Sequence, residues 1–461
     1  MFPLAKIPRT IKSTTLLGFI WGLASCQLER STTSQTALNL PSNFSGSGTE
    51  AVGPQWWRAF GDYHLNALES RALAGNFTLE SAAQRLRQAE AILKKAQSDL
   101  GPKVDGSLSG TVLEAGNDSR PGVLGLGLGA SYELDLWGRI QSRIAAEKLR
   151  TLASGEDYRA AALTLSAEVA TTWFRLVEAR EQTELIRGQI STNMKVVQSL
   201  ESRFVEGQGR GVDILRQRQL VEATRERLTV AELLSEVLEN QLQILLGRAP
   251  GSGGVPSGDR LPGLPASPRT GLPLQLLERR PDVRAAFARI RAADVGVAVA
   301  MTERYPRLTL TASTLSSGRS PSALFSDWIA GVGIDLVGPL FDAGERQAEV
   351  ERTEAVLREA IANYRQVVVV AIGEVENALA RERKQLQRIR QLETQLSLAE
   401  RSSQQLQREF VNGVSEYLEV LTALDDEQEL RRTVLSARRE LLEYRIALYR
   451  SLAGAFTITK T

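Results

Sequence analysis

The motif Phe204-Val-Glu-Gly207 returns 206 positions later as Phe410-Val-Asn-Gly413, and each copy closes a long stretch without proline, 139–206 and 344–412. Three further motifs of the first half recur in the same order in the second half. They are Arg85-Leu-Arg-Gln-Ala89 with Arg289-Ile-Arg-Ala-Ala293, Leu100-Gly-Pro-Lys-Val104 with Tyr305-Pro-Arg-Leu308, and Tyr132-Glu-Leu-Asp-Leu136 with Gly333-Ile-Asp-Leu336. The repetition predicts one architecture built from two similar halves.

The composition excludes several classes of function. The formal net charge is only +2, which gives no reason to expect a nucleic-acid partner. His64 is the one histidine and Cys26 the one cysteine, so neither a zinc site nor an internal disulfide is expected. The sequence also lacks a nucleophile motif and a Gly-rich phosphate loop between a strand and a helix. We therefore expect no enzyme, no catalytic residue and no metal.

The first 25 residues are predicted to be a lipoprotein signal peptide. A basic segment precedes an apolar core at 13–24, which is too short to span a membrane. The core ends in Leu23-Ala-Ser-Cys26, which resembles the bacterial lipobox, so we expect a covalent lipid on Cys26 and no cofactor. Gln27 favours delivery to the outer membrane, and residues 26–55 are expected to form a flexible tether. The alternative is an ordinary signal peptide with an incidental cysteine.

Four segments alternate between apolar and small or polar residues with a period of two. They are about 103–114, 122–136, 306–316 and 327–338. In the second segment the even positions from Leu124 to Leu136 are apolar, and the odd positions are Gly, Ser, Glu or Asp. This pattern is typical of a β-barrel with lipid outside and water inside, although soluble hairpins over a core also alternate. No segment after the signal peptide approaches eighteen uninterrupted apolar residues, so we expect no transmembrane helix.

Four strands are too few to close a barrel, for which about eight are needed. Several chains must therefore each contribute four strands, and three chains would give twelve. Counting the strands requires an oligomer but leaves the number of chains open.

Four long segments are predicted to be helices. They are about 139–206 and 212–246 in the first half, and about 344–411 and 417–453 in the second. Apolar residues at alternating spacings of three and four, such as Ile389, Leu392 and Leu396, predict coiled-coil seams. At 1.5 Å per residue the two longest helices are rods of about 100 Å. Shorter helices at 79–99 and 282–303 are expected to complete the wall.

The expected domain organisation follows from these segments. Residues 56–246 form the first structural repeat and residues 274–454 the second. The Gly- and Pro-rich segment 247–273 is the linker between them, and residues 455–461 are a C-terminal tail.

Four motifs give the chain a family resemblance. They are Trp56-Trp-Arg-Ala-Phe60, Tyr132-Glu-Leu-Asp-Leu-Trp-Gly-Arg139, Leu277-Glu-Arg-Arg-Pro-Asp-Val283 and Pro339-Leu-Phe-Asp-Ala-Gly344. Their types and order resemble those of the TolC-like outer-membrane factors, in particular the lipid-anchored NodT/OprM-type branch that serves resistance–nodulation–division efflux pumps. The resemblance covers essentially the whole chain after the signal peptide.

The resemblance implies an α+β membrane protein, internally duplicated and homotrimeric. A twelve-stranded β-barrel in the outer membrane would continue into a long α-helical barrel in the periplasm, with an equatorial belt between them that holds the linker. The implied partners are outer-membrane lipid, a periplasmic adaptor protein and an inner-membrane resistance–nodulation–division pump. The chain itself would be a passive exit duct for multidrug efflux, closed at its periplasmic end at rest.

The resemblance also places a gate beside the two Phe-Val-x-Gly turns. Acidic residues that constrict the family's pore fall on Asp213 and Glu419, although Asp213 could instead only cap its helix. The tips that dock the adaptor match four residues, Gly207, Gln208, Gly413 and Val414. The chain departs from some relatives at two positions of the gate, where it has Ser415 and Thr422. These departures leave the detailed latch open.

Other classes of function fit the sequence less well. A freestanding porin would alternate through most of the chain, and a lipid-anchored coiled-coil scaffold would lack the strands with an apolar face. Within the class of ducts, drug efflux, metal efflux and type I protein secretion remain alternatives, because the pump chooses most of the cargo.

Overall fold

The computed structural model describes residues 38–115, 118–258 and 260–452. Four strands make up its sheet, and they are β1 Lys103–Ala115, β2 Asp118–Leu134, β3 Arg307–Gly318 and β4 Trp328–Val337. Four long helices follow them in pairs: α3 Arg139–Val205, α4 Gly211–Leu245, α7 Glu345–Val411 and α8 Tyr417–Leu452. The shorter helices are α1 Tyr63–Gly75, α2 Phe77–Gln97, α5 Pro273–Arg279 and α6 Pro281–Thr302, with 3₁₀ turns η2 Trp56–Phe60, η3 Ser98–Leu100 and η4 Pro321–Phe325. Among the described residues, each half therefore contains two shorter helices, a hairpin of two strands and two long helices, in that order.

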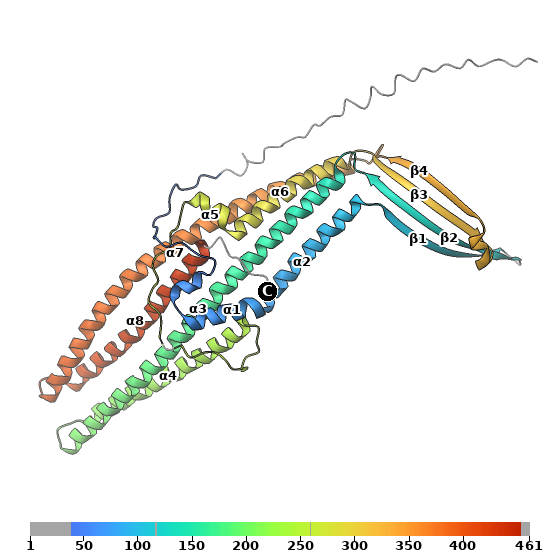
Figure 1. Cartoon of the computed structure of the whole chain (residues 1–461). Helices are drawn as coiled ribbons and strands as arrows, with labels where there is room; N and C mark the ends of the chain where they lie inside the picture. Colours follow the sequence, from blue (N-terminus) through green and yellow to red (C-terminus); the bar gives the residue numbers. More distant parts are fainter. Residues whose placement is uncertain (1–37, 116–117, 259, 453–461) are drawn as a thin grey trace, which may run out of the picture. The chain divides into compact units, whose positions relative to one another are not determined.

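The long helices pack as two antiparallel pairs. Figure 1 shows α4 running back along α3, and α8 running back along α7. Both α3 and α7 have 67 residues, which corresponds to about 100 Å of continuous helix. The helix α6 contacts both α3 and α7, while α2 packs on α3, so the shorter helices extend the layer formed by the longer ones. None of the helices that the structure describes combines the length and apolar composition of a membrane span.

The four strands form one antiparallel sheet in the order β1-β2-β3-β4. The register aligns Val104, Ala130, Ala312 and Val332 in one row across the sheet. Since residues directly opposite each other share a face, the even positions of all four strands lie on the same side, except beyond an irregularity after Thr111 in β1. That face is apolar and largely open, with Leu108 and Val332 exposed by 74% and 90%. The expected division into an apolar face and a face of small or polar residues is confirmed.

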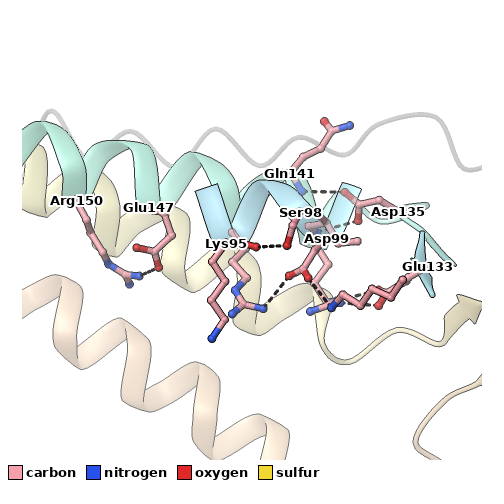
Figure 2. A network of polar contacts seen from close by, with 12 residues as sticks. Lys95, Ser98, Asp99, Glu133, Asp135, Gln141, Glu147 and Arg150 are labelled. Carbon is pink, nitrogen blue, oxygen red and sulfur yellow. Dashed lines mark hydrogen bonds and ion pairs between the residues drawn. The ribbon is translucent and has the colours of Figure 1, made fainter. Parts of the chain in front are cut away.

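The second strand ends two residues earlier than the sequence pattern predicts. Strand β2 stops at Leu134 because the side chain of Asp135 turns to the start of α3, where it accepts the N–H groups of Ile140 and Gln141, each at 2.9 Å (Figure 2). Such bonds satisfy donors that the first turn of a helix leaves free. The Glu133 carboxylate accepts two hydrogen bonds from the Arg139 guanidinium, at 3.0 and 2.7 Å. The junction between sheet and helix is therefore fixed by carboxylates.

The main core lies where the aromatic turn η2 meets α1, α3 and α8. Trp56 stacks on Tyr449 with ring centroids 5.7 Å apart, and Phe60 packs against Phe174. Trp173, fully buried, donates its Nε1–H to Asp62 at 2.6 Å. The aromatic residues near the N-terminus thereby join helices of both halves, and this core is the largest apolar cluster of the described residues.

The linker between the repeats is held by a buried arginine. Arg445 of α8, which is 2% exposed, makes a two-pronged ion pair with Glu382 of α7 at 2.8 and 2.7 Å. Its remaining N–H groups reach the carbonyl oxygens of Pro265 and Ala266. Because a planar guanidinium satisfies several acceptors at once, one side chain joins α7, α8 and the linker.

Candidate functional site

The two turns that reverse the long helix pairs have the same backbone geometry. Gly207 has φ of 76° and Gly413 has φ of 75°, a conformation that glycine adopts most readily. In the first turn, Gly207 N–H bonds the Phe204 carbonyl at 3.0 Å and Gln208 N–H bonds that of Arg203 at 2.8 Å. The second turn repeats these bonds, from Gly413 to Phe410 and from Val414 to Glu409. Both helices therefore end in a Schellman motif, and the repeated sequence forms a repeated structure.

The residues expected at the docking tips lie on the surface. Gly207, Gln208, Gly413 and Val414 are all exposed. Apolar side chains surround them, because Val205, Val411 and Val414 are exposed by 85%, 68% and 76%. The ends of both helix pairs thus present small and β-branched apolar groups to their surroundings.

Asp213 lies buried behind the first turn. Its side chain is 5% exposed and accepts two bonds from the guanidinium of Arg210, from Nε at 3.1 Å and Nη2 at 3.4 Å. Arg210, not Asp213, is the N-cap residue of α4, and it makes no side-chain cap. Asp213 is therefore not the N-cap residue of α4, and its side chain bonds a side chain instead of the first backbone N–H groups. A carboxylate in the first turn of a helix is also stabilised by the positive end of the helix dipole.

Several contacts join the first tip to the second, and one of them places the Arg203 guanidinium over the Phe410 ring, 4.7 Å from its centroid. Arg210 Nη2 lies 3.6 Å from Glu416 Oε2, and the hydroxyl of Tyr417 donates to Gln217 Oε1. Gln217 is fully buried and in turn donates its Nε2–H to the carbonyl oxygen of Asn193 at 3.0 Å. A small cavity of about 190 Å³ is lined by Arg210, Glu416 and Tyr417, among others. The tips of the two halves therefore meet through polar groups beside a small apolar cluster of Leu200, Tyr417 and Val420.

Tyr417 is the centre of this contact. Its side chain is 2% exposed and packs on Phe410 with ring centroids 5.4 Å apart. Burial, and then the charge of Asp213, raise the pKa of the Tyr417 hydroxyl far above its ordinary value. The raised pKa keeps the hydroxyl protonated, and so a neutral donor, at neutral pH.

Above the tips, the two helix pairs meet along a polar seam between α3 and α8. Asn193 and Gln428 exchange bonds in both directions, at 2.9 and 3.3 Å. One turn away, Gln189 donates to the Gln428 carbonyl at 3.1 Å and accepts from Arg432. These side chains are all buried. By comparison, the contacts between α7 and α8 include an apolar cluster around Ile389.

Glu419 has different surroundings from Asp213, although the sequence places both six residues after the glycine of a turn. It is exposed on α8 and lines a groove of about 360 Å³ together with Thr422 and Asp426. The Thr422 hydroxyl donates back to the carbonyl of Leu418 at 2.9 Å. Of the two expected gate carboxylates, Glu419 is open to solvent in this chain and Asp213 is covered.

Sequence reasoning missed three residues of the site, Arg210, Glu416 and Tyr417. A signal for two of them was present, because Arg210 and Glu416 occupy equivalent positions of the two repeats and carry opposite charges. Ser415, the recognised departure from the family, donates to the carbonyl of Leu406 at 3.3 Å and joins no ion pair. The arginine of this network comes from the first tip instead.

Two further expectations concern other parts of the chain. Cys26 lies outside the described residues, so its lipidation stays a prediction. Within the described ranges, no group of three or more His, Cys, Asp or Glu side chains is arranged to hold a metal ion.

Comparison with known proteins assigns the chain to a family. The profile described as outer membrane efflux protein matches residues 68–248 and 272–454, one match in each half. The chain is 30% identical over 426 residues to the pyoverdine export outer membrane protein OpmQ of Pseudomonas aeruginosa, covering 87% of each chain. It is 27% identical over 428 residues to the cation efflux system protein CusC of Escherichia coli, covering 90% of this chain and 91% of the relative. The structure of the outer-membrane channel OprN matches with a TM-score of 0.81 at 26% identity, covering 91% of this chain and 99% of that one. With both halves matched and the mixed helical and β fold shared, the chain is an outer-membrane efflux channel protein and belongs to the outer membrane efflux protein family.

Proposed function

We propose that the chain forms a homotrimeric exit duct, which conducts substrates passively from an inner-membrane pump and a periplasmic adaptor to the exterior. Twelve strands, four from each chain, close one β-barrel in the outer membrane, and the long helices continue it as an α-helical barrel in the periplasm. The number of three chains comes from the family resemblance.

The observation that carries this proposal is the open sheet. In the part of the chain that the structure describes, β1 and β4 each pair with one neighbouring strand, and every residue of β4 is exposed. Unpaired N–H and C=O groups are costly inside a bilayer, so each edge needs a partner strand. Pairing β4 of one copy with β1 of the next satisfies both edges and closes the sheet.

Native mass spectrometry of the full protein extracted from outer membranes tests the assembly. The expected mass is that of three processed chains that each carry a lipid. A stable monomer that keeps its strands, as judged by circular dichroism, would contradict the duct.

We assign the closing of the periplasmic end to the tip contact and to Glu419. The contact between Arg210 and Glu416 and that between Tyr417 and Gln217 hold the two helix pairs of one chain together. Glu419 is an exposed carboxylate near the tips, and three copies around one axis would form a ring that favours cations. Because the seam above them is polar, its groups regain hydrogen bonds to water when the helix pairs separate. Opening is therefore less costly than separating an apolar seam.

The partners follow from the exposed tips. A periplasmic adaptor would dock on Gly207, Gln208, Gly413 and Val414, where exposed valines gather at the ends of both pairs. Apolar groups that stay exposed on a monomer commonly mark a contact surface. The pump would be of the resistance–nodulation–division class. We assign the choice of cargo to the pump, since relatives of similar identity are named for pyoverdine export and for cation efflux.

Cys26 is the proposed site of the lipid anchor. The support is its place at the end of the apolar core, after Leu23-Ala-Ser. Metabolic labelling with a fatty acid is expected to mark the wild-type protein and to leave Cys26→Ser unlabelled. A labelled Cys26→Ser protein would contradict this assignment.

A further inference from the structure

The two halves of the chain are joined in the sheet by one seam, where β2 pairs with β3. At the helix end of this seam Leu134 lies opposite Leu308. The loop after β2, residues 135–138, then contacts the segment before β3. Trp137 stacks on Tyr305 with ring centroids 5.0 Å apart and donates its Nε1–H to the Pro306 carbonyl at 2.7 Å. An aromatic pair therefore closes the seam at the ends of the strands.

Among the described residues, the loop after β4 makes no aromatic contact of this kind. It comprises residues 338–344, and two of its side chains, Leu340 and Phe341, are 103% and 91% exposed. The segment before β1 also presents apolar surface, since Leu100 is 48% exposed. In the repeat, Leu100 to Val104 correspond to the residues around Tyr305 and Pro306. The chain thus carries both halves of a second seam, at the two opposite edges of its sheet.

We propose that Leu340 and Phe341 of one copy pack against Leu100 and Gly101 of the next copy, and so close the seam between subunits. This inference rests on the proposed oligomer. Strand β4 ends, and β1 begins, at the helix end of the sheet, just as β2 ends and β3 begins there. Antiparallel pairing of β4 with the next β1 therefore brings the two apolar segments together. Phe341 then occupies the place that Trp137 has in the seam within the chain.

Gly101 gives independent support. Its φ is −112°, which any residue can adopt, and an added Cβ would meet only the Ser98 carbonyl oxygen, at an ordinary 3.7 Å. Its own chain therefore does not require glycine, and the repeat has Tyr305 at the corresponding position. The missing side chain leaves room for one that comes from outside. Phe341 of the next copy is the large exposed group that the strand order brings there.

Three variants of the full protein test the packing. Gly101→Tyr, whose Cβ its own chain accommodates, is expected to lower the temperature at which the trimer separates during mild-detergent electrophoresis. Phe341→Ala is expected to lower it by the loss of buried apolar area. Because the double variant restores one large ring to the seam, it is expected to separate at a higher temperature than Gly101→Tyr alone. Strictly additive losses in the double variant would overturn the proposal.

Cross-linking tests the proximity itself. In a Phe341→Cys/Leu100→Cys protein, a short bismaleimide is expected to produce covalent dimers and trimers, since lipidation blocks Cys26. The matched control is Phe341→Cys/Arg304→Cys, because Arg304 precedes β3, both of whose neighbours, β2 and β4, belong to the same chain. The control is expected to give no products between chains.

The outcomes separate this inference from the proposed function. If native mass spectrometry finds trimers and the Phe341→Cys/Leu100→Cys protein stays uncross-linked, the packing proposed here is wrong and the duct stands. If the wild-type protein is monomeric, the proposed function fails and the seam fails with it.

Discussion

Arg210 and Glu416 stand at equivalent positions of two internal repeats, carry opposite charges, and lie with Nη2 and Oε2 3.6 Å apart. The duplication thus places complementary groups at the two points where the chain turns back. Arg210 also holds the buried Asp213, so one guanidinium connects the inside of the first tip with the surface of the second. The contact is exposed, and contacts of this kind are individually weak and sensitive to salt.

Reversing the charges of Arg210 and Glu416 is expected to change amide protection at the tips in steps. Glu416→Arg is expected to increase hydrogen–deuterium exchange of the tip amides by about two- to five-fold, the range of an exposed ion pair. Arg210→Glu/Glu416→Arg is expected to restore only part of the protection. The Arg210→Glu substitution places a second carboxylate beside Asp213, and the two like charges repel each other. Unchanged exchange in Glu416→Arg would show that the contact does not hold the tips.

Tyr417→Phe removes one oxygen and keeps the packing on Phe410. The buried Gln217 then loses a hydrogen-bond partner, which typically costs about 1–3 kcal/mol. We expect faster exchange of the amides in both tips, and little change in the sheet. Because the pKa of Tyr417 is raised, wild-type protection at the tips should not fall between neutral and moderately alkaline pH through loss of this proton. A fall that Tyr417→Phe abolishes would contradict the raised pKa.

Glu69 predicts a pH dependence of stability. This residue of α1 is fully buried, and burial raises its pKa well above the ordinary value, while the neighbouring Ser166 hydroxyl lowers it by less. The folded state therefore favours the protonated form. Its contribution to stability is complete below the unfolded pKa of about 4.3 and is lost as the pH rises through the folded pKa.

Glu69→Gln tests this dependence with a neutral side chain of the same shape. Above about pH 5 the variant should be more stable than the wild type and unfold at a higher temperature. The difference in the free energy of unfolding should grow by up to about 1.4 kcal/mol per pH unit until the folded pKa is reached. Below about pH 4 the two proteins should be alike. Thermal unfolding in detergent at several pH values measures the difference, and a gap independent of pH would exclude titration of Glu69 as its cause.

Arg445→Met predicts a large loss of stability. The substitution leaves Glu382 buried without its partner and frees the linker carbonyls of Pro265 and Ala266. Breaking a buried pair from one side costs about 3–5 kcal/mol, whereas replacing both partners by apolar groups is often nearly neutral. Unfolding by urea is expected to show the full loss in Arg445→Met and a smaller one in Arg445→Met/Glu382→Met. Equal losses in both variants would contradict this account.

Local sequence signals predicted the elements well, and contacts between halves poorly. The alternation of small and apolar residues along β2 located the strand, and the Phe-Val-x-Gly motifs located both turns, because each depends on neighbours in the chain. The end of β2 was missed by two residues, since the capping bonds of Asp135 are not visible in a period of two. The burial of Asp213 could not be predicted, because Tyr417 covers that site from about 200 residues away. Heptad spacing shows which face of α3 is apolar, but not that its buried Gln189 and Asn193 meet α8.

The most direct test of the central claim is single-channel conductance of the detergent-extracted protein in planar bilayers, beside an Asp213→Ala/Glu419→Ala variant. A duct closed at its periplasmic end predicts a small conductance for the wild type. Removal of both carboxylates should raise it, since Arg210 loses its buried partner and the ring at Glu419 loses its charge. A large and equal conductance in both proteins would contradict the gate, and no conductance from correctly folded protein would contradict the duct itself.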